Sequence, residues 1–156
     1  MIVFSVSALE KAPVTLQGEE PPEFLELAED DIFAAASPVC YDLTARLVSG
    51  GILVTGSVST SVSGICGRCL HPAECDVAAD EIELFMEAGD AEEIDISSDI
   101  RAELLLELPM NMLCSEDCQG ICPDCGADLN NEKCRCGEAK KTQGDFRWSA
   151  LDGLDL

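Results

Sequence analysis

Alternating apolar and polar positions dominate the first half of the chain and predict β-strands. Residues 1–9 alternate and are rich in Val, Ile and Phe, so we expect a first strand there. Two β-branched runs follow at residues 39–48 and 52–62, and the Ser49-Gly50-Gly51 sequence between them is typical of a hairpin turn. A further alternating run at residues 75–86 predicts a third member of the same sheet.

After residue 86 the alternating pattern ends, and from residue 99 the apolar residues follow a helical period. Residues 87–99 are rich in acids and nearly devoid of apolar residues, which predicts a loop. Residues 99–108 then place Ile and Leu side chains on one face of a helix, with Ser98 as a candidate N-cap and Pro109 as the stop.

From Cys114 onward the composition shifts to Cys, Gly, Asp and Asn, with few side chains to bury. A hydrophobic core cannot offset the ordering entropy of such a segment, so a metal ion is the expected organiser. The predicted fold class is α+β, mainly β, with a small antiparallel sheet domain, one helix and a C-terminal zinc-ribbon-like segment. We expect residues 1–113 to form the acidic β-rich domain and residues 114–156 the cysteine-rich tail.

Composition limits the classes of protein that this chain can represent. Hydrophobic residues make up 47% of the 156 residues but aromatic residues only 4%, so the core must consist mainly of Val, Ile, Leu and Ala. No run approaches the roughly 20 apolar residues of a membrane helix. The first residues lack the basic region of a signal peptide, so we expect a cytoplasmic protein without a membrane partner.

The charge is strongly negative, with nine Lys and Arg against 31 Asp and Glu, a formal net charge of −22. Nucleic-acid phosphates should be repelled by most of this surface, because their affinity comes from Lys and Arg. The acidity is consistent with steering a basic protein partner toward the surface, and equally with solubility or adaptation to a salty cytoplasm.

The basic residues are concentrated near the end of the chain, which predicts a second surface with a different partner. Five of the nine form a candidate RNA contact: Lys133, Arg135, Lys140, Lys141 and Arg147.

Ten cysteines without a secretory signal favour metal or redox chemistry over disulfides. Two Cys-x2-Cys pairs and a later Cys-x-Cys pair have the spacing of structural zinc ligands, and Gly after the second thiol of a pair permits a tight turn. One preferred site consists of Cys122, Cys125, Cys134 and Cys136. The other consists of Cys66, Cys69, Cys114 and Cys118. One or two Zn²⁺ ions are expected, and Cys40 and Cys75 are expected to be small buried strand residues.

Other chemistries fit the cysteines less well. The spacing from Cys118 to Cys125 is that of a catalytic iron–sulfur motif in radical enzymes, but only 31 residues follow, too few for their barrel. An electron-transfer iron–sulfur cluster stays open, although Cys-x-Cys and polar surroundings favour zinc. Neither Cys-x2-Cys pair opens a helix in a βαβ unit, as a thioredoxin motif would. His71 is interpreted as a loop residue, and with a single His no catalytic set is recognisable.

Several of these motifs together resemble the YceD-like family, the large ribosomal RNA subunit accumulation proteins of bacteria and plastids. They are Val62-x3-Cys66-x-Arg68-Cys69-Leu70, Leu108-Pro109, Cys118-x-Gly120-Ile121-Cys122-Pro123-x-Cys125-Gly126-x2-Leu129-Asn130, Cys134-x-Cys136 and Asp145-Phe146-Arg147-Trp148-x2-Leu151. The similarity covers the second two-thirds of the chain, with Phe146 where the family commonly has Pro. It implies that the site containing Cys66 is common to the family and that the site containing Cys122 is optional.

The resemblance implies a ribosome biogenesis factor that supports accumulation of large-subunit ribosomal RNA. Combined with the charge asymmetry, it suggests a non-enzymatic scaffold whose acidic surface holds a small basic ribosomal protein while the basic tail touches ribosomal RNA or its precursor. No small-molecule substrate is expected. The alternative is a redox- or zinc-responsive regulator linked to translation, and an enzyme acting on RNA is a third hypothesis.

Overall fold

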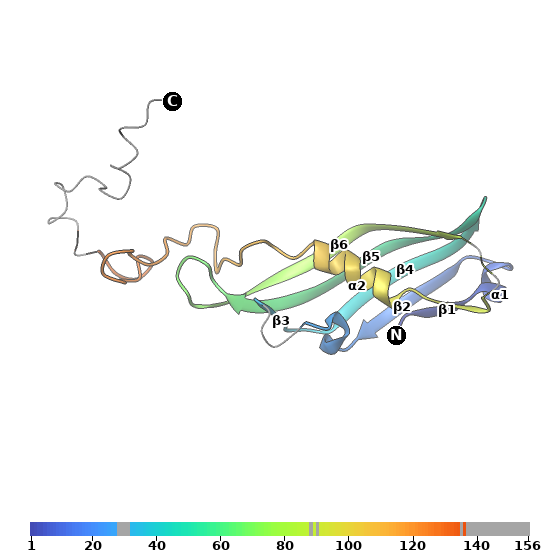
Figure 1. Cartoon of the computed structure of the whole chain (residues 1–156), viewed down its shortest axis with the longest axis horizontal. Coiled ribbons are helices and arrows are strands. Elements are labelled where there is room, and N and C mark those ends of the chain that lie inside the picture. Colours follow the sequence, from blue (N-terminus) through green and yellow to red (C-terminus); the bar gives the residue numbers. More distant parts are fainter. Residues whose placement is uncertain (28–31, 88, 90, 135, 137–156) are drawn as a thin grey trace, which may run out of the picture.

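Among the residues that the computed structural model describes, seven strands form two antiparallel sheets, with two α-helices beside them (Figure 1). The structure describes residues 1–27, 32–87, 89, 91–134 and 136. The expected class, mainly β with antiparallel pairing and a C-terminal cysteine cluster, is confirmed.

The larger sheet has five strands built around one long central strand. Its members are β2 (Val14–Glu20), β3 (Phe33–Ala35), β4 (Val39–Val48), β5 (Gly51–Ile65) and β6 (Pro72–Glu87). β2 pairs with β4, β4 with β5, and β6 lies along the opposite edge of β5. β3 pairs with the end of β5 that β4 leaves free, so the sheet is a twisted ribbon with β5 in the middle.

The hairpin between β4 and β5 follows the sequence pattern closely. β4 has the expected bounds, and the turn consists of Ser49 and Gly50, because Val48 pairs with Gly51. Gly50 has a φ of 96°, a left-handed conformation that Gly adopts without a Cβ penalty. The two following strands are longer than expected, because polar Ser and Pro positions at their ends still take part in the pairing.

A β-bulge in β6 keeps its apolar side chains on one face of the sheet. Between the pairs Gly56–Ile82 and Val58–Ala79, β6 has one residue more than β5. The apolar positions of β6 change from odd to even residue numbers at the bulge, and the extra residue keeps their side chains on the same face of the sheet. Apolar residues on both sides of the bulge are therefore buried. The acidic residues of β6 consequently share the outer face.

The smaller sheet was not expected from the sequence. It pairs β1 (Val3–Ser5) with β7 (Glu93–Asp95), and a short helix α1 (Val6–Leu9) follows β1. The prediction of one strand over residues 1–9 is thus only partly right. The prediction of a loop over residues 87–99 is wrong in its second half, where apolar side chains at alternating positions lie among the acids and the buried one, Ile96, enters the core.

Helix α2 (Ser97–Leu106) covers the inner face of the larger sheet (Figure 1). It buries Ile100 and Leu104, as the helical pattern predicted. Ser98 does not cap it, because the N-cap residue is Ile96 and the Asp95 carboxylate accepts the backbone N–H of Ser97 at 2.8 Å. The sequence predicted one helix, whereas the described part of the chain contains two α-helices, α1 and α2.

A 3₁₀ turn, η1 (Pro22–Leu25), closes the core beside α2. The Arg101 Nε donates a hydrogen bond of 2.6 Å to the carbonyl oxygen of Phe24, and its guanidinium lies 5.3 Å from the centre of the Phe24 ring. Arg101 also pairs with Glu26 at 2.8 Å. These contacts fix the helix to the N-terminal part of the chain.

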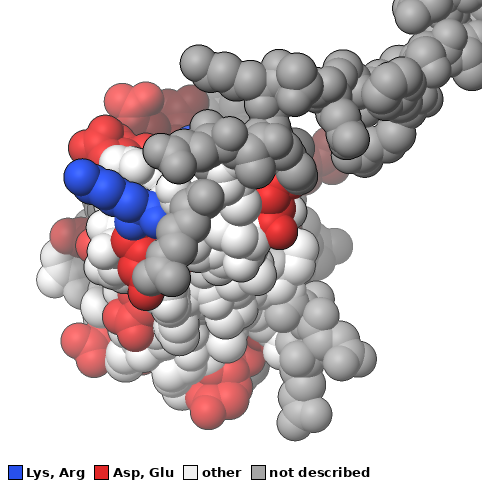
Figure 2. Space-filling model, turned by 90° about the vertical axis from the view of Figure 1, so that its left-hand side faces the viewer, with Lys and Arg blue, Asp and Glu red and all other residues white. Residues whose placement is uncertain are grey.

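The cysteine-rich segment lies at the end of the sheet where β5 turns into β6, away from α1 (Figure 1). Figure 2 views the molecule from this end, where Asp and Glu side chains occur at several places around the surface and Lys or Arg side chains at few. No helix among the described residues is long and apolar enough to cross a membrane.

Candidate metal centre

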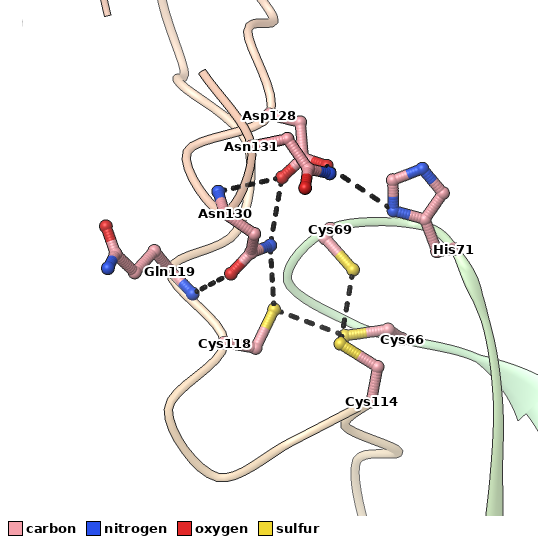
Figure 3. Close-up of polar contacts among 9 residues, drawn as sticks. All are labelled: Cys66, Cys69, His71, Cys114, Cys118, Gln119, Asp128, Asn130 and Asn131. Atoms are coloured by element: carbon pink, nitrogen blue, oxygen red, sulfur yellow. Dashed lines mark hydrogen bonds and ion pairs between the residues drawn. The ribbon is translucent and has the colours of Figure 1, made fainter. Parts of the chain in front are cut away.

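Four cysteines from two distant segments meet beyond the end of the sheet (Figure 3). Cys66 and Cys69 lie in the turn between β5 and β6, whereas Cys114 and Cys118 follow α2. The Cys66 and Cys118 sulfurs are 3.8 Å apart, those of Cys69 and Cys114 are 3.5 Å apart, and all four lie within 4.8 Å of one another. We refer to these four residues as the first tetrad.

Backbone hydrogen bonds form the turn that carries the first two thiols. The N–H of Cys66 donates to the carbonyl oxygen of His71 at 2.9 Å, and the N–H of Leu70 donates to that of Cys66 at 3.0 Å. Leu70 adopts a left-handed φ of 61°, which reverses the chain immediately after the second thiol. The N–H of Gly67 reaches the carbonyl oxygen of Met112 at 2.8 Å and thereby attaches the segment that follows α2.

The sulfur positions fit a tetrahedral zinc ion. With zinc–sulfur bonds of about 2.3 Å, the sulfurs at two corners of a tetrahedron are about 3.8 Å apart. All ten cysteines are free thiols, and the separations in the first tetrad are far longer than a disulfide bond of about 2.05 Å. Four thiolates would complete the coordination of zinc, and the same donors also suit an iron–sulfur centre.

A second tetrad lies farther along the chain and consists of Cys122, Cys125, Cys134 and Cys136. The sulfur of Cys134 is 3.2 Å from that of Cys122 and 3.9 Å from that of Cys125. The backbone N–H of Cys136 donates to the Cys134 sulfur at 3.3 Å. N–H donors of this kind stabilise the negative charge of a thiolate, as expected around a metal ligand.

The second tetrad is built on a turn of the expected kind. The N–H of Gly126 donates to the carbonyl oxygen of Cys122 at 2.9 Å, and the N–H of Cys122 donates to that of Ala127 at 2.8 Å. Gly126 has a φ of 72°, a conformation that favours Gly. A single antiparallel bridge between Ile121 and Asp128 closes the loop.

The two tetrads differ in their exposure to solvent. In the first, the exposed fractions of Cys66, Cys69 and Cys118 are 0%, 4% and 4%, and Cys114 is exposed. In the second, only Cys122 is buried, whereas Cys134 and Cys136 are half-buried and Cys125 is exposed. Reagents and chelators should therefore reach the second tetrad more easily.

Each tetrad contains thiols with opposite acid–base tendencies. Hydrogen bonds from backbone N–H groups, chiefly the N–H of Cys69, lower the pKa of Cys66 to about 6. The backbone N–H of Cys125 is the main cause that lowers the pKa of Cys122 to about 7. The pKa of Cys114 is raised to about 12, chiefly by its hydrogen bond with Cys118, and Cys136 is raised to about 12 by Cys125. Neighbouring thiols oppose full ionisation of the set, and a divalent cation would remove that opposition.

Asn130 and Asp128 connect the second tetrad's loop to the first tetrad (Figure 3). The Asn130 Nδ2 donates to the Cys118 sulfur at 3.5 Å, and the Asp128 carboxylate lies 3.8 Å from the Nδ1 of His71. Sequence reasoning missed both residues, although the Asn-rich loop was visible. His71 belongs to neither tetrad.

The structure brings together the two sets of four cysteines that spacing had grouped. That they bind metal, and that the domain boundary lies at residues 113–114, stay predictions. The prediction that Cys40 is buried is wrong, since it points from the outer face of β4 and is exposed, whereas Cys75 is half-buried against the core. Of the candidate RNA contacts, Lys133 is exposed. The others, Arg135, Lys140, Lys141 and Arg147, lie outside the described residues.

Comparison with known proteins shows which family the second half of the chain resembles. Residues 88–155 match the family model of the large ribosomal RNA subunit accumulation protein YceD. The chain is YceD-like. The matched segment contains Cys114, Cys118 and the whole second tetrad, whereas Cys66 and Cys69 precede it.

Two plant relatives carry the same family description. The chloroplastic large ribosomal RNA subunit accumulation protein YCED homolog 1 of Arabidopsis thaliana is 44% identical over 55 residues. The match covers 35% of this chain and 17% of the plant protein. The Zea mays homolog is 36% identical over 77 residues, 49% of this chain and 25% of its own length. An uncharacterized protein of Mycobacterium tuberculosis is 36% identical over 125 residues, 70% of this chain. The chain spans 58% of that mycobacterial protein's length. No solved structure matches the chain.

Proposed function

We propose that the chain is a non-enzymatic cytoplasmic factor that supports accumulation of large-subunit ribosomal RNA on a scaffold stapled by two zinc ions. The observation that carries this proposal is the first tetrad. It would tie the YceD-matching segment, through Cys114 and Cys118, to the turn at the end of the acidic sheet. One metal ion would thus hold two surfaces of different charge in a defined arrangement.

A structural role for the metal is supported by the donor sets. Each tetrad offers four thiolates, which fill all positions of a tetrahedral zinc ion. Catalytic zinc sites keep one position for water or substrate, and a full set of four cysteines leaves none. Zinc here would organise the chain instead of activating a substrate.

The outer face of β6 supports the proposal of a basic protein partner. Its exposed acidic residues, which we name the β6 acidic stripe, are Glu74, Asp76, Asp80, Glu81, Glu83 and Glu87. No Lys or Arg occurs in β6. Alternate residues of a strand are about 6.6 Å apart, less than the screening length of about 8 Å at physiological salt, so neighbouring charges reinforce one another. Such a stripe favours rapid encounter with a basic protein, such as a small ribosomal protein.

Loss of the protein should lower large-subunit ribosomal RNA relative to small-subunit ribosomal RNA in the source cells. Complementation should fail with the Cys66→Ser, Cys69→Ser double variant and succeed with Cys40→Ser, whose exposed thiol belongs to neither tetrad. A normal ratio of the two RNAs in cells without the protein would contradict the proposal.

The tail's contribution is tested separately. Charge reversal at Lys133, Arg135, Lys140 and Lys141 to Glu should abolish RNA-dependent association with ribosomal precursors, because phosphate affinity depends on these cations. Reversal of Lys11 and Arg46, which lie outside the tail, should leave that association in place. If the charge-reversed variant still associates with ribosomal precursors, the tail does not bind RNA, and only the proposed contact with a basic protein partner is left.

A second candidate function is a redox- or zinc-responsive regulator linked to translation, favoured by the exposed thiol of Cys125 within a tetrad. It predicts that an alkylating agent modifies Cys125 in the zinc-loaded protein within minutes, and that modification changes binding to ribosomal components. If the zinc-loaded protein resists alkylation at all eight thiols, this alternative fails.

A further inference from the structure

Asn130 belongs to the loop that the second tetrad closes, yet its side chain faces a sulfur of the first tetrad (Figure 3). Its Nδ2 donates to the Cys118 sulfur at 3.5 Å and to the Asp128 carboxylate at 2.9 Å. The Asn130 side chain therefore places one amide proton toward each of two acceptors.

The orientation of this amide is determined by a third contact. The backbone N–H of Gln119 donates to the Asn130 Oδ1 at 2.8 Å. The opposite orientation would put the amide oxygen against both the Cys118 sulfur and the Asp128 carboxylate, where it could only repel them. With the orientation seen here, all three contacts are satisfied at once.

Asn130 is held in place by its own loop. Its backbone N–H donates to the Asp128 Oδ1 at 3.0 Å, and the N–H of Leu129 donates to the carbonyl oxygen of Gly120 at 2.9 Å. The ends of this loop carry Cys122 and Cys134, whose sulfurs are 3.2 Å apart. Ordering the second tetrad thus orders the residue that donates to the first.

We propose that Asn130 is a positioning residue that couples the two tetrads, so that metal bound by the second strengthens metal binding by the first. An N–H···S bond spreads the negative charge of the thiolate and fixes the direction of its lone pairs toward the metal. By linkage the effect is reciprocal, because a metal-bound Cys118 also favours the ordered loop. The proposal rests on metal binding by both tetrads, as in the proposed function.

The first test compares two matched variants in the full chain, Asn130→Asp and Asn131→Asp. Asn131 donates to the Asp128 Oδ2 at 2.7 Å, so both variants replace a donor to the same carboxylate by a new charge. Only the first removes the donor to sulfur. We expect the Asn130→Asp variant to lose metal from the first tetrad about tenfold more readily, the lower end of the range for outer-shell partners, and the Asn131→Asp variant less than about twofold.

Peptide-resolved alkylation during a zinc-chelator challenge measures this loss at each tetrad separately. Cobalt substitution adds a signature that a purely structural role would not move, since a lost N–H···S bond shifts the thiolate-to-cobalt charge-transfer bands. Equal behaviour of the two variants in both measurements would overturn the role of Asn130. If the purified protein holds no metal at either tetrad, the zinc scaffold fails together with this inference.

Coupling itself is tested by adding Cys134→Ser, which disables the second tetrad. In the native background this change should accelerate alkylation of the first tetrad by about the same factor as Asn130→Asp. In the Asn130→Asp background it should add little, because the contact it acts through is already lost. Additive effects, or no effect in the native background, would exclude coupling through Asn130.

Discussion

The side chain of Arg68 donates a hydrogen bond of 3.0 Å to the carbonyl oxygen of Cys118. The same nitrogen donates to the carbonyl oxygen of Glu116 at 3.0 Å, and the Arg68 carbonyl oxygen accepts the N–H of Ile121 at 3.0 Å. A residue between the first two thiols thus holds the main chain on both sides of the fourth thiol, even without a metal–ligand bond.

Replacing Arg68 by Ala should loosen the segment from Glu116 to Ile121. Loss of the charged donor should cost about 1–2 kcal/mol, less than a buried charged hydrogen bond because Arg68 is exposed. Hydrogen exchange at the Ile121 amide should become about tenfold faster. Arg46→Ala on β4 is the control and should leave that exchange rate unchanged. Unchanged protection in the Arg68 variant would show that the metal–ligand bonds alone hold the segment.

Two glycines of the tail with similar backbone angles allow a test of close packing. Gly120 has a φ of 75°, and a Cβ there would lie 2.8 Å from the Arg68 carbonyl oxygen. Gly126 has a φ of 72° with nothing within 4 Å of that position. Both Ala variants carry the left-handed penalty of about 1–2 kcal/mol, and Gly120→Ala adds the clash. Thermal unfolding of the zinc-loaded proteins should show the larger loss for Gly120→Ala, and equal losses would contradict the close approach.

In the metal-free, reduced protein, the contribution of the tetrad thiols to the free energy of unfolding should be largest near pH 9. The lowered pKa values of Cys66 and Cys122, about 6 and 7 against an ordinary 9.0, stabilise the fold above pH 9, and this stabilisation is lost as pH falls toward 6. The raised values of Cys114 and Cys136, about 12, stabilise it below pH 9 and are lost as pH rises toward 12.

Melting temperatures in chelator and reductant between pH 6 and 9 should therefore rise. The rise should be smaller in Cys66→Ser and unchanged in Cys40→Ser, which removes a thiol outside the tetrads. A slope that is identical in all three proteins would mean that these thiols do not produce the pH dependence.

Helix α2 should contribute to stability through one face only. Leu104 is 1% exposed and Leu106, two residues later, is 78% exposed. Leu104→Ala should lower the free energy of unfolding by about 2–5 kcal/mol, since it leaves a cavity against the sheet. Leu106→Ala should change it by less than about 0.5 kcal/mol. Urea unfolding of both variants checks the difference, and similar midpoints would place the helix differently on the sheet.

Local pattern was sufficient for the central strands and the helix. The alternation over residues 39–48 predicts β4 without error, because side chains of a strand point to opposite faces in turn. The smaller sheet was not predicted because β1 and β7 have three residues each, and the strands of the larger sheet lie between them along the sequence. Such short strands exist only through their long-range pairing, which no local pattern encodes.

The sequence by itself determined which cysteines could form close pairs, because two thiols with two or fewer residues between them can meet in a single tight turn. Only the tertiary structure decided that the turn after β5 meets the segment after α2, since that meeting depends on where the helix packs on the sheet. The same holds for Asn130, whose partner Cys118 lies 12 residues earlier. Spacing along a chain fixes what is near in sequence, and packing of the core fixes what is near in space.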